Sequence, residues 1–145
     1  MRFAKKYYCL MGMVGGMITA LVAVGRAADG SPASPPMAVH VSPDGVQRAE
    51  VTLDSYAYTP NHLVVERGKP VELTLSSITI ITPHNFLIHE PSSGLRVEQD
   101  VGAGKTVMVR FVPTEPGRFV FFCDKRLWPM ASHRDKGMEG ILEVK

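Results

Sequence analysis

The sequence predicts an all-β fold, either a sandwich or a barrel, because short strand-like segments alternate with turn signals along the chain. The 145 residues include 13 Gly and 11 Pro, and many of these fall in clusters between apolar or β-branched segments. Turn signals roughly 8 to 12 residues apart are typical of sandwiches and barrels. No segment shows a convincing amphipathic helical pattern, and no internal repeat is evident. The composition fits one small domain.

Seven segments have strand character. The clearest alternation places Val71, Leu73 and Leu75 on one face, opposite Glu72 and Thr74, as in a half-buried strand. The predicted strands are 46–53, 62–66, 71–75, 85–88, 106–112, 119–123 and 141–144, and residues 76–82 extend or bend the third. Turns rich in Gly, Pro, Asn or Asp are predicted at 54–61, 67–70, 90–94, 101–105 and 113–117. At most a helical turn fits residues 128–133.

The first 27 residues have the pattern of a secretory signal peptide. Arg2, Lys5 and Lys6 form a basic start, residues 7–24 are largely apolar, and small residues precede the expected cleavage point near Ala27. An uncleaved anchor is the alternative, since an apolar stretch of this length just spans a bilayer. Either way the domain is expected outside the cytoplasm, and we assign it to the periplasm.

The remaining chain divides into a flexible linker, residues 28–45, and a domain, residues 46–145. The linker is rich in Pro, Ser and Gly, and its His40 is expected to be solvated. The whole chain has a formal net charge of +2, but removal of residues 1–27 leaves 12 basic against 14 acidic residues. A mature domain near −2 gives no indication of nucleic-acid binding.

The cysteine content points to a ligand or a reactive thiol. The chain has two Cys, and Cys9 lies in the predicted signal peptide, so the mature chain keeps Cys123 alone in an oxidising compartment. Without a partner for a disulfide, Cys123 is either a functional thiol or an inert core residue.

The residues around Cys123 favour a metal site. His133 and Met138 follow within sixteen residues, and His84 after Pro83 supplies a second imidazole upstream. Thiolate, imidazole and thioether are poor ligands for magnesium or calcium, which take oxygen. They suit copper, and a trigonal His2Cys site with a long axial Met is the blue-copper arrangement.

These motifs resemble those of the cupredoxins, the family of plastocyanin and azurin. The resemblance covers roughly residues 47 to 145 and rests on PHNF around His84, FVFFC ending at Cys123, and SHRDKGMEG with His133 and Met138. Four residues separate His133 from Met138, as in the plastocyanin-like pattern. Nine residues separate Cys123 from His133, which is longer than in the small electron carriers and leaves Met130 as a rival axial ligand.

The resemblance implies a Greek-key β-sandwich that holds one copper ion through His84, Cys123, His133 and Met138. It also implies that Asn85 ties the two ligand loops together near the Cys sulfur. Met138 as a plain core residue is the alternative for that position. His62 and His89 are expected to be structural or solvent-facing, with His89 near the rim of the site.

The implied function is one-electron transfer rather than catalysis. A binuclear centre would need two Cys on this loop, and the multicopper enzymes place a His beside the Cys, where this chain has Phe122 and Asp124. The alternatives are a periplasmic copper chaperone or resistance protein that holds Cu(I) with the same ligands, and an accessory subunit of an oxidase.

The segment after Cys123 is a candidate docking surface. Lys125, Arg126 and Trp128 combine basic and apolar side chains, which would suit a redox partner with an acidic rim, such as a cytochrome or a terminal oxidase or reductase. A solvated charge cluster interspersed with acidic residues is the alternative.

Overall fold

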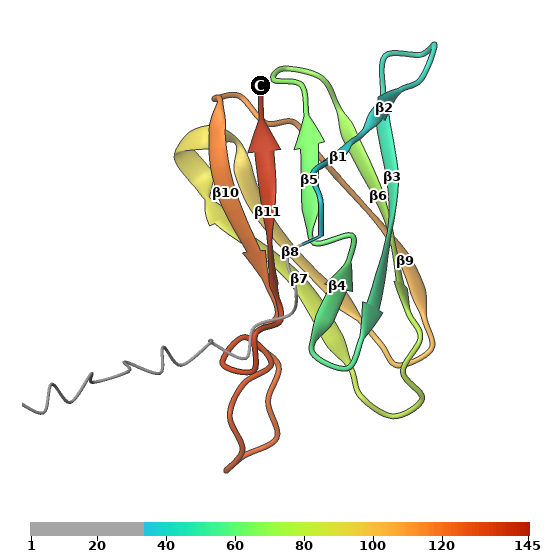
Figure 1. The fold of residues 1–145 in the computed structure, drawn as a ribbon, viewed down its shortest axis with the longest axis vertical. Helices are drawn as coiled ribbons and strands as arrows, with labels where there is room; N and C mark the ends of the chain where they lie inside the picture. Colours follow the sequence, from blue (N-terminus) through green and yellow to red (C-terminus); the bar gives the residue numbers. More distant parts are fainter. Residues whose placement is uncertain (1–33) are drawn as a thin grey trace, which may run out of the picture.

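The computed structural model describes residues 34–145, and the predicted signal peptide, residues 1–27, lies outside the described residues. Two β-sheets form a sandwich, with the C-terminus at one end and a long loop projecting from the other (Figure 1). The predicted all-β sandwich is confirmed. Within residues 34–145, no helix is long and apolar enough to cross a membrane.

The first sheet carries the strands nearest to the candidate site. Its order is β1 (Met37–Ala38), β5 (His62–Val65), β11 (Glu139–Val144), β10 (Gly117–Phe122), β7 (His84–Glu90) and β8 (Leu95–Val101). Strand β11 runs parallel to β5 and antiparallel to β10, where Gly140 lies opposite Phe121. A Cβ at Gly140 would collide with the Phe121 ring and the Asn61 carbonyl oxygen, so the close packing here requires glycine.

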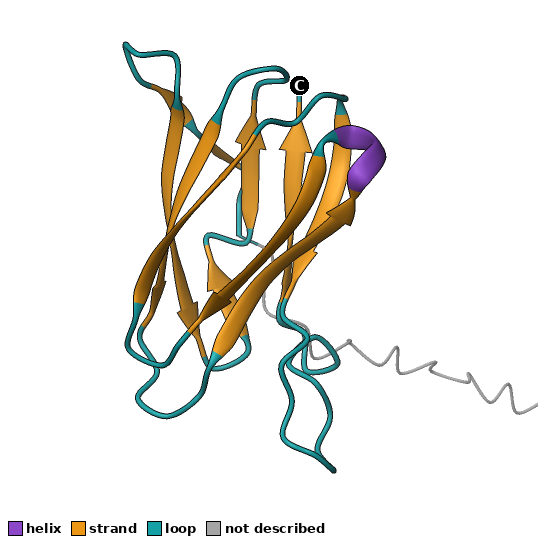
Figure 2. Ribbon diagram, turned by 180° about the vertical axis from the view of Figure 1, so that it is seen from behind, coloured by secondary structure: helices purple, strands orange, loops and turns teal. Residues whose placement is uncertain are grey.

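The second sheet covers the first. Its order is β2 (His40–Val41), β3 (Gln47–Asp54), β6 (Val71–Ser77) and β9 (Thr106–Phe111), and β4 (Ala57–Thr59) pairs with β3. Strands β3 and β6 are parallel, whereas β6 and β9 are antiparallel. The one short helical element in the described chain, a 3-10 turn at Pro91–Ser93, lies at the end away from the projecting loop (Figure 2).

Apolar side chains from both sheets fill the space between them. The predicted inward residues Val71, Leu73 and Leu75 are fully buried, as are Phe86 and Phe121 from the opposite sheet. The Phe86 and Phe121 rings stack with centroids 4.9 Å apart. The other fully buried large side chains are Leu53, Tyr58, Leu63, His84, Ile88, Leu95, Met138 and Leu142. The core therefore extends directly to the residues of the candidate site.

Several predicted boundaries differ from the structure. Strand β8 was not predicted, although Leu95, Val97 and Val101 are buried between exposed polar residues, which is the alternation of a half-buried strand. Strand β4 lies inside the predicted turn 54–61 and pairs with β3. Residues 128–133 contain turns but no helix, since the chain there runs out along the projecting loop.

The described part of the predicted linker, residues 34–45, contains two short strands. Strand β1 pairs with β5, and β2 pairs with β3, so both sheets gain a short edge strand from the 28–45 segment. The Ser34 amide also donates to the side-chain oxygen of Asn61 at 2.7 Å. The domain thus begins before residue 46. His40 is exposed, as predicted, but it lies on a strand rather than in a flexible tether.

The strand arrangement brings three separate segments to one end of the sandwich. Strand β7 begins at His84, antiparallel β10 ends just before Cys123, and β11 begins just after Met138. In an antiparallel pair, the start of one strand lies beside the end of its neighbour. His84, Cys123 and Met138 therefore lie at the same end of the sandwich, which is the end that carries the projecting loop (Figure 1).

Candidate metal centre

His84 is fully buried, and neither of its ring nitrogens has a hydrogen-bond partner. Buried polar atoms are nearly always paired, because an unpaired one loses its hydration without replacement. Burial, and secondarily the nearby His133, lowers the pKa of His84 to about 4. The imidazole is therefore neutral at physiological pH and presents a nitrogen lone pair to which no hydrogen-bond donor points.

Cys123 is fully buried directly after β10. Its Sγ accepts a hydrogen bond from the Asn85 amide at 3.4 Å, and its own amide donates to the Met138 carbonyl at 3.1 Å. Burial raises the pKa of the thiol, while the backbone amides of Asn85 and Lys125 oppose that shift. A coordinated metal ion would deprotonate such a thiol.

His133 completes the group from the projecting loop. Its Nδ1 lies 3.4 Å from the Sγ of Cys123, and its ring centroid is 5.1 Å from that of His84. Its amide donates to the Lys125 carbonyl at 2.8 Å. The side chain is buried, and burial lowers its pKa, with a second contribution from the Lys136 charge.

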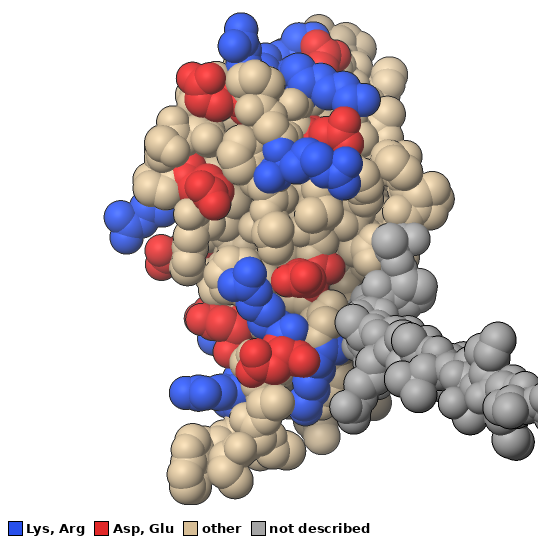
Figure 3. Space-filling view, turned by 60° about the vertical axis from the view of Figure 1, so that its left-hand side comes forward, with Lys and Arg blue, Asp and Glu red and all other residues tan. Residues whose placement is uncertain are grey.

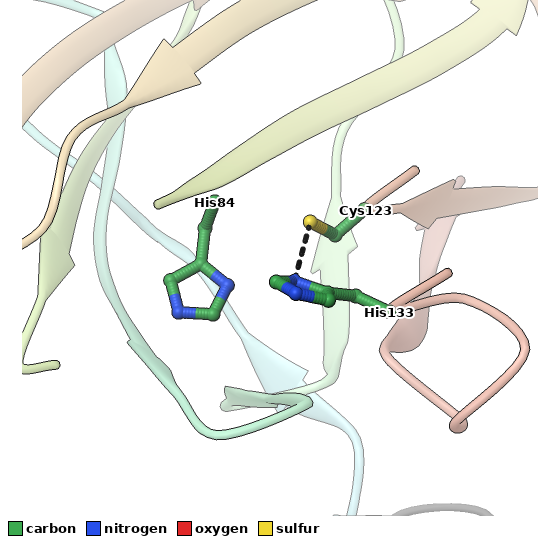
Figure 4. A group of neighbouring side chains, drawn as sticks. All are labelled: His84, Cys123 and His133. Atoms are coloured by element: carbon green, nitrogen blue, oxygen red, sulfur yellow. Dashed lines mark hydrogen bonds between the residues drawn. The ribbon is translucent and has the colours of Figure 1, made fainter. Parts of the chain in front are cut away.

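The three side chains converge on a common point. One nitrogen from each of His84 and His133 and the Sγ of Cys123 all lie within 4.8 Å of one another (Figure 4). Among residues 34–145, this is the one such group of His, Cys, Asp and Glu ligand atoms. Two neutral imidazoles and one thiol form a soft donor set that suits copper. The unpartnered nitrogens of His84 indicate that the site is built for an ion.

The two candidate axial methionines have different surroundings. Met138 is fully buried; its amide donates to the His133 carbonyl at 2.9 Å, and its carbonyl accepts from the Cys123 amide. Met130 is 48% exposed on the projecting loop and lines a cavity of about 340 Å³ beside His133.

Asn85 lies between the two segments that carry His84 and Cys123. Its side-chain nitrogen donates to the Asp124 carboxylate at 2.7 Å, and its side-chain oxygen accepts from the Asp124 amide at 3.1 Å. Together with the bond from its own amide to the Cys123 sulfur, this gives three contacts across the ligand loops. Asn85 thus fixes the start of β7 against the end of β10.

The other histidines lie away from this group. His62 forms an ion pair or hydrogen bond with Glu143 at 3.0 Å between β5 and β11. His89 is exposed, and its ring lies edge-on to Phe122 with centroids 5.3 Å apart.

The candidate docking residues differ in solvent exposure and in whether they already form an ion pair. Trp128 is 82% exposed and Arg126 is also exposed, whereas Lys125 is only partly exposed and pairs with Asp100 at 2.7 Å. In Figure 3 the tip of the projecting loop shows no charged side chain, and charged groups gather above it. The exposed apolar residues of this loop are Leu127, Trp128 and Met130.

Sequence reasoning missed two tyrosines that support the site. The Tyr58 hydroxyl donates to the Asn85 carbonyl at 2.5 Å, and burial raises its pKa far above the usual value. The Tyr56 ring lies edge-on to His133 with centroids 5.0 Å apart. Both belong to the β3–β4 hairpin, and both lie within residues 54–61, which the sequence predicted to be a turn. The alternation of Tyr56 and Tyr58 is the one local signal, and it does not reveal the contacts with His133 and Asn85.

The fold and the buried histidine–cysteine group define this chain as a small β-sandwich metal-binding domain. It belongs to a known family, since the family model of the Cupredoxin-like domain matches residues 17–137. Members of the cupredoxin family bind one copper ion, which agrees with the donor set formed by His84, Cys123 and His133. No curated protein sequence matches the chain.

Solved copper proteins share this fold. The metal-binding domain of the Cu(I)-exporting P-type ATPase CopA from Streptococcus pneumoniae is 22% identical, with a TM-score of 0.58 over 77% of this chain and 96% of that domain. Auracyanin from Roseiflexus castenholzii is 20% identical, with a TM-score of 0.54 over 68% of this chain and 96% of that protein. Auracyanin A from Chloroflexus aurantiacus, a "blue" copper protein, is 16% identical, with a TM-score of 0.51 over 70% of this chain and all of that protein. At these identities the likeness concerns the fold alone.

Proposed function

We propose that this protein is an exported one-electron carrier that holds a single type 1 copper ion. His84, Cys123 and His133 would hold the ion, and Met138 would add a weak thioether ligand. A periplasmic location follows from the predicted signal peptide and suits a chain whose domain has one unpaired cysteine.

The observation that carries this proposal is the fully buried, unpartnered imidazole of His84 close to Cys123. A purely structural histidine at this depth would have a hydrogen-bond partner. A metal ion would occupy the lone pair of a neutral imidazole, so it would resolve the unpaired nitrogen and the buried thiol together.

The chain's own residues would keep the ligands still during electron transfer. Copper would accept and release the electron by alternating between Cu(II) and Cu(I). Asn85 holds the start of β7 to Asp124, and the amide of Cys123 bonds to the Met138 carbonyl. A ligand set fixed in this way would move little between the two oxidation states, which favours fast electron transfer. The thiol has no exposed surface for substrate binding, which supports a carrier rather than an enzyme.

Burial favours Met138 over Met130 as the axial ligand, since Met138 is fully buried and its backbone is bonded to both His133 and Cys123. Met138→Leu should change the reduction potential and the visible spectrum of the copper protein. Met130→Leu is the matched control on the exposed loop and should change neither. The opposite result would assign the axial position to Met130.

Visible and electron paramagnetic resonance spectra of the mature domain with one equivalent of Cu(II) test the central proposal. We expect an intense thiolate-to-copper band and a type 1 spectrum, both lost in Cys123→Ser. A colourless protein with a stoichiometric Cu(I) site would instead support a copper chaperone or resistance protein. Two observations favour that second candidate: the exposed nine-residue loop between Cys123 and His133, which would allow ion exchange, and the shared fold with a copper-exporter domain.

The partner would be a redox protein, such as a cytochrome or a terminal oxidase or reductase, that docks on the projecting loop. The exposed Trp128 would supply the apolar contact and Arg126 the charge, whereas Lys125 is already paired with Asp100. Arg126→Glu should therefore reduce the salt dependence of electron transfer more than Lys125→Glu. Equal salt dependence in both variants and the parent protein would exclude this surface.

A further inference from the structure

The loop that carries His133 has little support of its own. Of the nine residues between Cys123 and His133, seven are exposed: Asp124, Arg126, Leu127, Trp128, Pro129, Met130 and Ala131. A loop of this kind opens at a low free-energy cost, because it buries few apolar contacts. The orientation of the His133 ring must therefore depend on contacts with another part of the fold.

Tyr56 provides such a contact from the opposite sheet. It lies in the two-residue turn between β3 and β4, where Asp54 pairs with Ala57. Its ring meets the His133 ring edge-on, with centroids 5.0 Å apart and an angle of 73° between the planes. This T-shaped geometry is a favourable arrangement for two aromatic rings.

Lys136 also contacts the Tyr56 ring. The Lys136 Nζ lies 4.1 Å from the centroid of the Tyr56 ring and donates to its hydroxyl at 3.0 Å. Lys136 is three residues after His133, and its amide donates to the carbonyls of Ser132 and His133. One loop thus contacts Tyr56 through both His133 and Lys136, and these contacts fix the loop to the second sheet.

The backbone of Tyr56 has a conformation that is unusual for a bulky residue. Tyr56 has a φ of 62°, and it is the one non-glycine residue with positive φ among residues 34–145. A bulky residue in this region is unusual, and Gly or Asn would fit the turn at lower cost. Strain of this kind is retained where the surrounding structure or the function needs it.

We propose that Tyr56, held by Lys136, is a positioning residue that fixes the His133 imidazole for metal binding. The role of His133 as a ligand rests on the proposed function, whereas the contact between Tyr56 and His133 is a feature of the structure itself. Tyr56 would not be a ligand itself; it would act through the orientation of the His133 ring.

The test compares three variants of the mature domain. Tyr56→Asn removes the ring but suits the turn, so the fold should survive. Lys136→Met removes the cation over Tyr56. Arg134→Met is the matched control: the Arg134 guanidinium lies 4.1 Å from the centroid of the Phe122 ring, the same separation as that between the Lys136 Nζ and the centroid of the Tyr56 ring.

Two measurements on the metal-free protein do not depend on copper. In Tyr56→Asn, the His133 ring signals in nuclear magnetic resonance spectra should broaden or split. Hydrogen exchange of the His133 amide should be about tenfold faster, which corresponds to about 1.4 kcal/mol. Lys136→Met should show a smaller change in the same direction, and Arg134→Met none. Unchanged ring signals and exchange in folded Tyr56→Asn would overturn the proposal.

The copper-loaded protein separates this inference from the proposed function. If copper binds as a type 1 site, Tyr56→Asn should alter its paramagnetic resonance spectrum, whereas Arg134→Met should not. If the parent protein forms no type 1 site but Tyr56→Asn still mobilises His133, the proposed function fails and the positioning role stands. If the parent protein has a type 1 site and Tyr56→Asn leaves His133 unchanged in the metal-free protein, the positioning role fails alone.

Discussion

Two halves of the site are held in place by different means. His84, Asn85 and Cys123 form the sheet-held half, fixed by strand pairing and by the hydrogen bonds between Asn85 and Asp124. His133 and Met138 form the loop-held half, carried by a segment that leaves the sandwich and returns. The first half rests on aromatic core packing, whereas the His133 ring is held by side-chain contacts with Tyr56, Cys123 and His84.

This difference shows where the domain can vary without losing its site. The sheet-held half shares its packing with the whole core, so a change there costs global stability. His133 and Met138 are themselves buried, but the segment between Cys123 and His133 is mostly exposed. A change in that exposed segment should therefore alter docking or metal binding with little effect on unfolding. The predictions below test this division, from the largest expected effect on stability to the smallest.

Phe121→Ala should have the largest effect. The Phe121 ring is fully buried, stacks on Phe86 and meets Tyr58 edge-on with centroids 5.1 Å apart. Loss of a buried Phe side chain typically costs about 3–5 kcal/mol, because both the transfer energy and a cavity are involved. Chemical unfolding of the metal-free domain measures this loss. A cost below about 1 kcal/mol would mean that the sheet-held half is not supported by the core.

Asn85→Ala should have an intermediate effect. The substitution removes two hydrogen bonds to Asp124 at the junction of the ligand segments. We expect a loss of about 1–3 kcal/mol in the free energy of unfolding. Ser132→Ala is the control on the loop-held half, where the Ser132 hydroxyl bonds to the exposed Asp135 at 2.7 Å. If Ser132→Ala proves equally costly, the two halves do not differ in the way described.

The sequence predicted the sheet-held half better than the loop-held half, for a physical reason. Strand patterns and the motif around His84 are local, since alternation and turn residues act over a few positions. The family resemblance alone implied that Asn85 ties the two ligand loops together near the Cys sulfur, and it did not give Asp124 as the partner. No local sequence pattern predicts the Tyr56–His133 contact, because this contact depends on how the two sheets face each other.

The edge strands illustrate the same limit. Strands β1 and β2 have two residues each and lie in a segment whose Pro and Ser content suggested a linker. They form because β5 and β3 offer unpaired backbone groups at the sheet edges, a property of the neighbours rather than of residues 37–41. Strand β8 differs, because its alternation was present in the sequence and could have been recognised.

Acid should act at the buried histidines of the site, whose pKa values are lowered, and also at a place remote from both halves. Glu72 is buried on β6, and its hydrogen bond with Arg110, followed by that with Arg48, lowers the pKa of its carboxyl below the usual 4.5. The ionised form is therefore favoured in the folded state. This contribution is fully present above about pH 4.5 and is lost as the pH falls through the lower pKa of the folded state.

Glu72→Gln should therefore flatten the acid limb of the stability curve of the metal-free domain below about pH 4.5. The free energy of unfolding should be measured across this pH range in the parent protein and the variant. The difference between the two curves gives the contribution of Glu72, and the pH dependence that remains in the variant comes from other titrating groups. Parallel curves for the two proteins would show that Glu72 is not the source, and the loss would then be sought elsewhere.

Trp128→Ala should have the smallest effect on stability. The side chain is 82% exposed at the tip of the projecting loop, so its removal forfeits little buried surface. We expect a change within about 0.5 kcal/mol in the free energy of unfolding, as for most exposed positions. The rate of electron exchange with a redox partner should fall all the same, because a large exposed indole is well suited to an interface. A large loss of stability would mean that Trp128 stabilises the fold, and the two halves would then not differ in their contribution to stability.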